Sequence, residues 1–329
     1  MSVRSVLLVT NPLSGHGKGL TAAAPARARL TERGIRVTEV RGATAAESTS
    51  LIRAALTGDD PPDAVACAGG DGLICITLQA LADNEVPLGL IPGGTGNDLA
   101  RELAIPDHDP IAAADIIAAG RTRPIDLGLI EPGPRPETRP PLGTGPGEAR
   151  EPEFGGDPLP EPLRFATVAG TGFDARVTLR ANRMRYPKGP LRYTLAAVAE
   201  LAGGLAVPYR IELAGATGQS EVVETDAIMV AVGNTHSYGG GMMICPDAVI
   251  DDGLLEVSVI GAMSRLEMMR LLPALSAGKR VDHPALRQYR AAAVTLRAPG
   301  APATADGEPA GRLPATFRAL PAAQHILVP

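Results

Sequence analysis

Short apolar segments that alternate with helical segments dominate the first 128 residues and constrain the fold more than any other feature. The apolar segments cover residues 5–10, 35–40, 64–69 and 87–94. Helical periodicity is found near residues 20–33, 44–57, 73–82 and 111–119. This alternation predicts βαβ units and a parallel sheet, in which ligands bind at the carboxyl ends of the strands.

Three of the predicted strands end in glycine-rich breaks, which read NPLSGHGKG, GGDG and PGGTGND. A glycine-rich turn between a strand and a helix leaves backbone N–H groups free to bind phosphate. The first break does not match the P-loop pattern G-x-x-x-x-G-K-[ST], because Pro12 occupies the first glycine position and Gly19 follows Lys18. The three breaks together predict a nucleotide site of another design.

Asp71, in the second break, can be interpreted in two ways. Alone, it is equally well explained as a residue that caps the following helix. Among phosphate-binding loops, its carboxylate would either meet a bridging divalent cation or accept a proton from an attacking hydroxyl. The neighbouring polar loops favour the chemical role.

Composition excludes several classes of protein. The net charge of −5 and the pI near 5.6 argue against non-specific nucleic-acid binding, which requires a broad basic surface. The three cysteines are dispersed and have no CxxC spacing, so they indicate neither a disulfide framework nor a zinc site. The apolar run SVLLV is shorter than a signal-peptide core or a membrane span, and we expect a cytoplasmic protein.

The length of 329 residues predicts two domains, and the amino-acid composition changes near their boundary. Residues 131–162 contain ten prolines and almost no large apolar side chains, which predicts a disordered insert, with a linker as the alternative. Five β-rich runs follow, interrupted by helical segments near 191–204 and 264–277. An antiparallel sandwich is therefore expected for the second domain.

Seven motifs, taken in order, resemble those of the bacterial diacylglycerol kinase family, which is related to the sphingosine and ceramide kinases. They read NPLSG, GGDG, PGGTGND, IDLG, GTGFDARV, YGGGMMICPDAVIDDGLLEV and DGE. The resemblance spans nearly the whole chain. It implies an α/β nucleotide-binding domain like that of NAD kinase and phosphofructokinase at 1–128, a β-sandwich lipid domain at 129–311, and a final segment, 312–329, that packs back on the first domain.

The same resemblance implies the residues of the site. Glu308 would be the catalytic base, with Asp71 as a rival for that role, and Asp98 and Asp126 would lie near the substrate. A structural Mg²⁺ would bind the Asp252 carboxylate and the carbonyl groups of Val249 and Leu254. The nucleotide phosphates would meet Asn11, Ser14, Gly15, Gly69, Gly70, Gly72, Gly94, Thr95, Gly96 and Asn97.

From the residues alone, the DGE motif indicates only an Asp-Gly hairpin turn with an exposed Glu308. The second break also departs from the family, because Leu73, Cys75 and Ile76 stand where polar residues are expected. These departures leave open a non-catalytic lipid-binding or regulatory protein, and the GGDG motif leaves open an NAD kinase-like enzyme. We predict an ATP- and Mg²⁺-dependent lipid kinase, with diacylglycerol as the first-choice acceptor.

The predicted partner is a lipid at the inner face of the membrane; no nucleic acid and no transmembrane segment are expected, and a homodimer stays open. Residues 175–193 contain six basic residues and no acid, which fits either attraction to anionic headgroups or an ordinary solvated face. Met268 and Met269 fit core packing better than a cleft for acyl chains.

Overall fold

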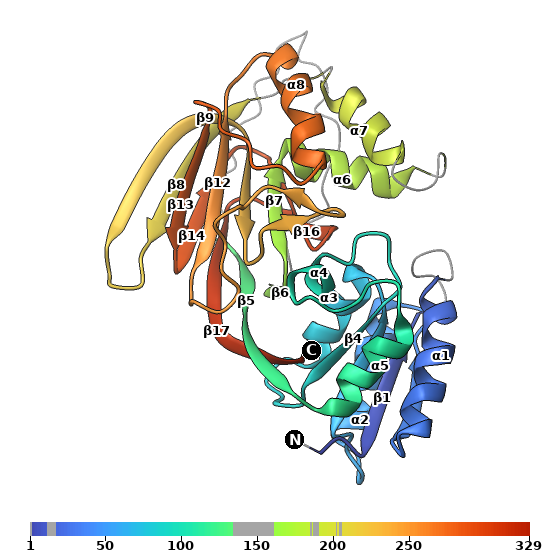
Figure 1. Cartoon of the computed structure of the whole chain (residues 1–329). Helices are drawn as coiled ribbons and strands as arrows, with labels where there is room; N and C mark the ends of the chain where they lie inside the picture. Colours follow the sequence, from blue (N-terminus) through green and yellow to red (C-terminus); the bar gives the residue numbers. More distant parts are fainter. Residues whose placement is uncertain are drawn as a thin grey trace.

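The first half of the chain folds as a parallel sheet with helices on both faces. The computed structural model describes residues 2–11, 18–133, 161–184, 186, 191–201, 203 and 206–329. The sheet has the order β2, β1, β3, β4, and α1 packs on α5 while α2 packs on α3 (Figure 1). The elements are β1 (Ser5–Thr10), α1 (Lys18–Glu32), β2 (Arg36–Arg41), α2 (Ala45–Leu56), β3 (Ala64–Gly69), α3 (Asp71–Ala80), β4 (Leu88–Pro92), α4 (Asp98–Glu102) and α5 (Pro110–Ala119).

Burial and capping explain why these segments form these elements. Every residue of β1, β3 and β4 is buried, as expected for strands that are covered on both faces. The Thr44 side chain accepts a hydrogen bond from the Glu47 N–H at the start of α2, and Asp109 caps α5 in the same manner. Gly120, in the left-handed conformation, ends α5. The predicted α/β alternation is confirmed.

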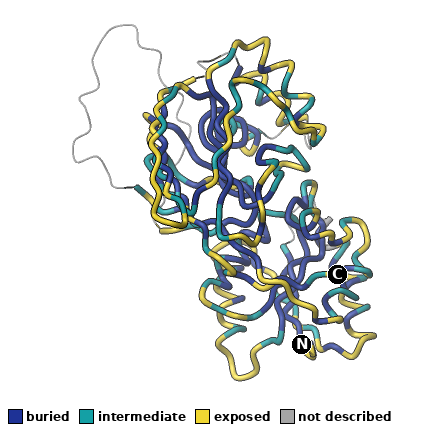
Figure 2. Tube along the Cα trace, turned by 60° about the vertical axis from the view of Figure 1, so that its left-hand side comes forward, coloured by how far each residue is buried: buried dark blue, intermediate teal, exposed yellow. Residues whose placement is uncertain are grey.

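The second half is largely antiparallel, as the sequence predicted. The elements are β5 (Thr122–Pro132), β6 (Leu163–Phe165), β7 (Val168–Gly172), α6 (Phe173–Arg183), α7 (Leu191–Leu201), β8 (Val207–Ala214), β9 (Ser220–Gly233), β10 (Ser237–Tyr238), β11 (Met242–Met243), β12 (Leu255–Gly261), α8 (Arg265–Ser276), β13 (Leu286–Ala291), β14 (Ala293–Arg297), β15 (Pro302–Ala305), β16 (Glu308–Arg312) and β17 (Ala315–Leu327). Strands β7 and β12 are buried throughout, whereas β8 and β13 are buried only at some positions, and Figure 2 shows buried segments inside and exposed segments at the periphery.

The long strand β17 joins the two halves into one continuous sheet. It pairs antiparallel with β14 and β5, and near its end Ile326 pairs in parallel with Leu88 of β4. The register between β17 and β5 shifts between Leu320 and Gln324, where the chain bends from one half to the other. The boundaries at 128/129 and 311/312 stay predictions.

Helix α6 was not predicted, and part of the predicted insert is not described. Helix α4 has only five residues, too few for a periodic signal. Helix α6 is rich in arginine, and two of its arginines pair with Glu200 of α7, so its helical state depends on a tertiary contact. Residues 134–160 of the predicted insert lie outside the described residues.

Candidate active site

The glycine loops converge at the carboxyl ends of neighbouring parallel strands. A Cβ atom placed on Gly94 would lie 2.5 Å from the Cα of Gly70, and the Gly93 N–H donates to the Gly69 carbonyl at 2.9 Å. A Cβ on Gly19, at the start of α1, would lie 3.0 Å from the Ala68 carbonyl oxygen. The backbones approach so closely that no side chain fits between them.

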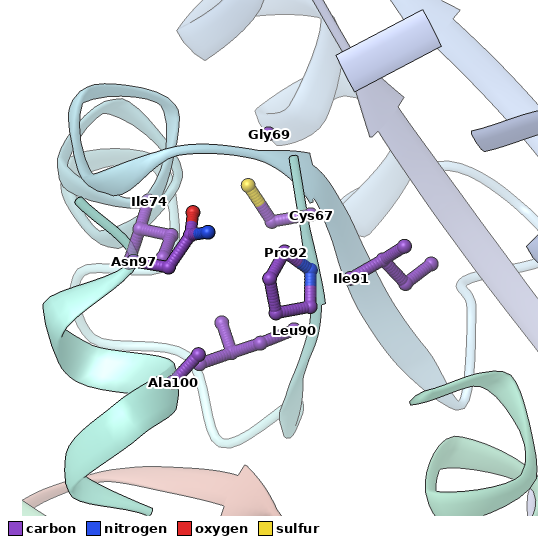
Figure 3. Close-up of a pocket in the computed structure, with 8 residues that line it drawn as sticks. All are labelled: Cys67, Gly69, Ile74, Leu90, Ile91, Pro92, Asn97 and Ala100. Atoms are coloured by element: carbon purple, nitrogen blue, oxygen red, sulfur yellow. The ribbon is translucent and has the colours of Figure 1, made fainter. Parts of the chain in front are cut away.

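Beneath these loops the structure is closed. Figure 3 shows the side chains of β3, β4, α3 and α4 around a space too small to hold a water molecule. Its lining residues are Cys67, Gly69, Ile74, Leu90, Ile91, Pro92, Asn97 and Ala100. A nucleotide therefore has no room below the loops, and the open side above them is where phosphates can bind.

The loop after β4 is shaped by Asn97, which adopts the left-handed conformation with φ of 54°. Its Oδ1 accepts a hydrogen bond from the Gly94 N–H at 2.9 Å, and its Nδ2 donates to the Gly94 carbonyl at 3.3 Å. The Asn97 side chain is buried, whereas Thr95 is exposed at the tip of the loop. Asn97 thus holds the loop closed and leaves Thr95 accessible to a ligand.

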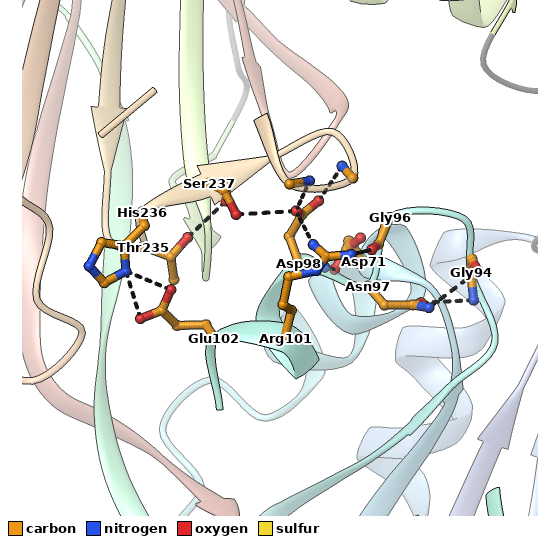
Figure 4. Close-up of polar contacts among 12 residues, drawn as sticks. Asp71, Gly94, Gly96, Asn97, Asp98, Arg101, Glu102, Thr235, His236 and Ser237 are labelled. Atoms are coloured by element: carbon orange, nitrogen blue, oxygen red, sulfur yellow. Dashed lines mark hydrogen bonds and ion pairs between the residues drawn. The ribbon is translucent and has the colours of Figure 1, made fainter. Parts of the chain in front are cut away.

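Asp71 begins α3 and faces the loop after β4. Its Oδ1 accepts a hydrogen bond from the Asp98 N–H at 3.0 Å (Figure 4). Burial raises the pKa of Asp71 to about 6, with additional contributions from the negative charges of Asp98 and Asp306. A Cβ on Gly96 would lie 2.8 Å from Oδ2 of Asp71 and 3.0 Å from Oδ2 of Asp98, so only glycine fits between the two carboxylates.

Asp98 connects the two halves of the molecule through its buried carboxylate. It accepts hydrogen bonds from the N–H groups of Gly240 and Gly241, each at 2.8 Å, and from Arg101 at 2.8 Å. The Ser237 hydroxyl lies 3.4 Å from Oδ1. Because these glycines are more than 140 positions away along the chain, Asp98 fixes the phosphate loop against the 237–241 loop of the second half.

A second polar contact lies beside this one. His236 Nδ1 is 2.9 Å from a carboxylate oxygen of Glu102, on α4 (Figure 4). The Tyr238 hydroxyl donates to Asp174 of α6, and burial raises the pKa of Asp174 to about 6. Sequence reasoning did not select any of these four residues, because only the tertiary structure brings them together.

Glu308 follows a tight turn that Asp306 anchors. The buried Asp306 carboxylate accepts hydrogen bonds from the N–H groups of Ala166 and Thr167, at 2.9 and 2.8 Å. Glu308 itself is exposed, and its Oε1 lies 2.9 Å from where a Cβ on Gly72 would be. Reduced solvation and the charge of Asp306 raise the pKa of Glu308. The second half of the chain thus brings Glu308 to the start of α3, next to Asp71.

Other predicted site residues lie elsewhere or are not described. Asn11 is half-buried after β1, and Ser14 and Gly15 lie outside the described residues. The Asp126 carboxylate is buried and accepts hydrogen bonds from the N–H groups of Gly253 and Ala322, at 2.6 and 2.7 Å. These contacts place it at the junction of the two halves.

The predicted metal turn, 249–254, does not present a free carboxylate. Asp252 forms an ion pair with Arg290, and its other oxygen accepts the Leu254 N–H at 3.0 Å. Within the described residues, no three His, Cys, Asp or Glu side chains are grouped so that they could hold a metal ion. Arg290 thus neutralises the one carboxylate that was predicted as a ligand, and Mg²⁺ binding at this turn, which would also use two backbone carbonyl groups, stays a prediction.

The residues of α3 that differ from the family motif lie mainly in the protein interior. Leu73 and Cys75 are buried and Ile76 is half-buried. The Cys75 thiol lies 3.8 Å from the Arg164 carbonyl of β6, and Gln79 donates to the same carbonyl at 2.7 Å. Leu73 and Cys75 therefore contribute to packing inside the protein.

An open hollow of the surface, formed by described residues of the second half, is separate from these loops. It has a volume of about 940 Å³ and lies between β8, β9 and the ends of the loops around Pro299 and Pro314. No residue predicted for the site lines it. Among the described helices, none combines the length and the apolar character that crossing a bilayer requires.

Comparison with known proteins gives the same arrangement of two parts. Residues 5–130 match the diacylglycerol kinase catalytic domain, and residues 167–328 match the YegS C-terminal NAD kinase beta sandwich-like domain. A putative diacylglycerol kinase from Bacillus anthracis has the same fold, with a TM-score of 0.72, 20% identity, and coverage of 100% of this chain and 98% of that one.

Several named proteins are similar to this chain over most of its length. A diacylglycerol kinase of Mycobacterium tuberculosis is 41% identical over 327 residues, which are 99% of this chain and 96% of the relative. A diacylglycerol kinase of Bacillus subtilis is 27% identical over 81% of this chain and 78% of its own. A probable YegS-like lipid kinase of Xanthomonas campestris is 31% identical over 67% and 63%. The chain therefore belongs to the bacterial diacylglycerol kinase-like family of lipid kinases, which are phosphotransferases.

Proposed function

We propose that the protein transfers the γ-phosphoryl group of ATP to the hydroxyl of diacylglycerol, giving ADP and phosphatidic acid. One observation carries this proposal: Glu308, from the second half of the chain, lies over Gly72, the residue that follows Asp71 in the second glycine loop of the first half. A base contributed by one half therefore lies at the phosphate loops of the other, as direct transfer between two bound substrates requires.

Glu308 is the better candidate for the general base. The Asp71 carboxylate already accepts the Asp98 N–H, whereas Glu308 is exposed and can reach a lipid hydroxyl. Glu308 accepts the proton of the lipid hydroxyl as its oxygen attacks the γ-phosphorus, and ADP leaves from the opposite side. Thr95 and the backbone N–H groups of the glycine loops hold the phosphates in line.

Asp71 fits a role in holding a Mg²⁺ that arrives with ATP. Burial is the main cause of its raised pKa, and the negative charges of Asp98 and Asp306 raise it further, so a bound cation would favour the ionised carboxylate. Oxygen ligands are those that Mg²⁺ prefers. The bound ion would neutralise charge on the phosphate oxygens during transfer.

Diacylglycerol is the proposed acceptor because the relatives of M. tuberculosis and B. subtilis carry that name. The X. campestris relative is named only as a probable lipid kinase, so other lipid alcohols belong in the test. An acceptor of this kind also requires the protein to work in contact with a membrane surface, from the cytoplasmic side.

The test is transfer of labelled γ-phosphate to diacylglycerol in mixed micelles, with and without Mg²⁺. We expect Mg²⁺-dependent phosphatidic acid from the parent protein and a loss of at least about 100-fold in rate for Glu308→Gln and for Asp71→Asn. Glu85→Gln, an exposed glutamate outside the site, serves as the control and should keep the parent rate. Full activity of Glu308→Gln would exclude Glu308 as the base, and product from another lipid alcohol alone would exclude diacylglycerol.

A further inference from the structure

Exposed apolar side chains are concentrated in one part of the surface. Eleven large hydrophobic side chains of the described residues are exposed, and seven of them lie within residues 186–198 and 266–269. Most of these seven belong to helices α7 and α8. Single exposed apolar residues are ordinary on a protein surface, whereas a concentration of this kind marks a site of interaction.

Both helices carry an apolar stripe on the side that faces solvent. On α7, Leu191, Leu195 and Val198 are 65%, 50% and 60% exposed, and their spacing places them on one face. On α8, Leu266 and Met269 are 54% and 50% exposed. We call these five residues the α7/α8 face.

The opposite sides of the two helices are packed in the protein core. Ala196 and Leu201 of α7 and Met268 of α8 belong to one buried cluster, together with residues of α6, β7 and β9. A surface helix that is packed on one side ordinarily presents polar residues on the other. The α7/α8 face departs from this pattern, because apolar residues also occupy its outer side.

The helices around this face are held together as one unit. Arg176 and Arg180 of α6 pair with Glu200 of α7, at 3.3 and 2.5 Å. Arg265, at the start of α8, donates to the Gly203 carbonyl at 3.1 Å, just beyond the end of α7. Figure 1 shows the three helices gathered on the same side of the second half. The apolar stripes are thus presented by a fixed scaffold.

The charge of this unit is opposite to that of the whole protein. Helices α6, α7 and α8 carry six arginines and three acidic residues, in a chain whose net charge is −5. Asp174 bonds Tyr238, Glu267 caps α8, and Glu200 neutralises Arg176 and Arg180 of α6. Arg192 of α7 and Arg270 of α8, on the same helices as the apolar stripes, form the cationic border of the face. A cationic border around an apolar face complements an anionic lipid surface.

The unit also adjoins the candidate active site. Asn182, near the end of α6, donates through Nδ2 to the Gly307 carbonyl at 3.0 Å. Gly307 directly precedes Glu308, the proposed base. A bilayer in contact with this unit would lie beside the end of the molecule that presents Glu308.

We propose that the α7/α8 face docks on an anionic phospholipid bilayer, with its five apolar side chains in the interfacial region and Arg192 and Arg270 at the headgroups. This inference deepens the proposed function and rests on it, because a lipid acceptor is what requires docking. A bilayer fits better than a second copy of the chain, since a two-fold contact through this face would bring its cationic border against itself.

The test is sedimentation of the full-length protein with vesicles of phosphatidylglycerol and phosphatidylcholine. We expect Leu191→Gln/Leu195→Gln and Leu266→Gln/Met269→Gln each to weaken vesicle binding about tenfold or more, and Arg270→Gln to weaken it less. Leu51→Gln/Ile111→Gln, which changes two exposed apolar residues on α2 and α5, is the matched control and should bind like the parent. Binding by the parent should fall on vesicles of phosphatidylcholine alone and at high salt.

Activity on a short-chain diacylglycerol, dissolved below its micelle concentration, separates docking from chemistry. The α7/α8 variants should phosphorylate this soluble acceptor at the parent rate. The docking proposal would be overturned if both double variants bound vesicles like the parent. It would also be overturned if sedimentation velocity showed that the parent is a dimer and that these substitutions convert it to a monomer. A parent that binds the vesicles through this face but phosphorylates no diacylglycerol would instead overturn the proposed function and support the docking face.

Discussion

The buried carboxylate of Asp71 lowers the stability of the folded protein at neutral pH, where it is ionised. Its pKa is about 6 in the folded protein, against 3.8 for an unperturbed aspartate, with burial as the main cause. Ionisation of Asp71 therefore costs the folded state free energy, a cost that begins above pH 4 and is complete above pH 6. The folded protein keeps a carboxylate where a neutral group would be more stable.

The substitution Asp71→Asn should consequently raise stability and abolish activity. At pH 7.5 we expect the free energy of unfolding to increase by about 1 to 2 kcal/mol, because asparagine keeps an acceptor for the Asp98 N–H and removes the buried charge. Near pH 4 the difference from the parent should shrink toward zero. Urea unfolding at the two pH values measures it, and a loss of stability at pH 7.5 would contradict this expectation.

At the residue scale, the sequence indicated candidate reactive groups more readily than the residues that surround them. Gly70, Asp71 and Thr95 could be selected because glycine-rich breaks that recur at the ends of neighbouring parallel strands indicate a ligand site. Glu308 required the resemblance to a family, since its own surroundings indicate only a hairpin turn. Asp306 was missed, because its hydrogen bonds reach residues about 140 positions earlier in the chain.

At the scale of elements, the contact between two loops is the feature most specific to this site. The loop after β4 and the 237–241 loop meet through the Asp98 side chain. Its buried carboxylate is the acceptor for two backbone N–H groups and one arginine. This side chain therefore helps to hold the loop after β4 in position against the second half of the chain.

Removal of the Asp98 carboxylate should therefore be costly. We expect Asp98→Ala to lower the free energy of unfolding by about 2 to 3 kcal/mol, because the N–H groups of Gly240 and Gly241 lose their acceptor. Asp60→Ala is the control, since Asp60 forms an exposed ion pair with Arg36 and should change stability by less than about 1 kcal/mol. Equal stability of the two variants in urea would show that the loop contact does not stabilise the fold.

The turn 249–254 permits a direct test of the predicted structural metal. Arg290 forms an ion pair with the Asp252 carboxylate and would compete with a metal ion for it. We therefore expect millimolar Mg²⁺ to raise the Tm of Arg290→Gln more than it raises the Tm of the parent. The additional substitution Asp252→Asn should remove this increase. Arg287→Gln, on the same strand, is the control because its side chain bonds Thr225 instead. An Mg²⁺ effect that persists without the Asp252 carboxylate would exclude this turn as the metal site.

The helices and strands were predictable where the sequence has a continuous apolar run or a recognisable helix cap. β1, β3 and β4 are continuous apolar runs, and α2 and α5 begin at Thr44 and Asp109, which are recognisable caps. Helix α4 is a short helix after a left-handed Asn97, so its length could not be judged from a periodic pattern. Local patterns thus reveal the elements that support the site, and tertiary contacts determine those that complete it.

At the scale of the whole molecule, β5 and β17 make the two halves continuous. Residues of β17 pair with β14 and β5 in the second half and with β4 in the first. The sequence indicated strands in both halves, but no local signal predicts that the last strand extends the first sheet. The position of Glu308 relative to Asp71 depends on this connection as well as on the loops.

Asp126 lies at this junction, and its substitution separates a structural role from the substrate role that the family resemblance implies. Its buried carboxylate binds Ala322 in the bend of β17 and Gly253 in the turn before β12. We expect Asp126→Ala to lower the free energy of unfolding by about 2 to 4 kcal/mol and Asp126→Asn to lower it less, because asparagine retains one acceptor. Amide hydrogen exchange should rise most around residues 320–326. Parent-like stability combined with a raised KM for the lipid would instead assign Asp126 to the substrate.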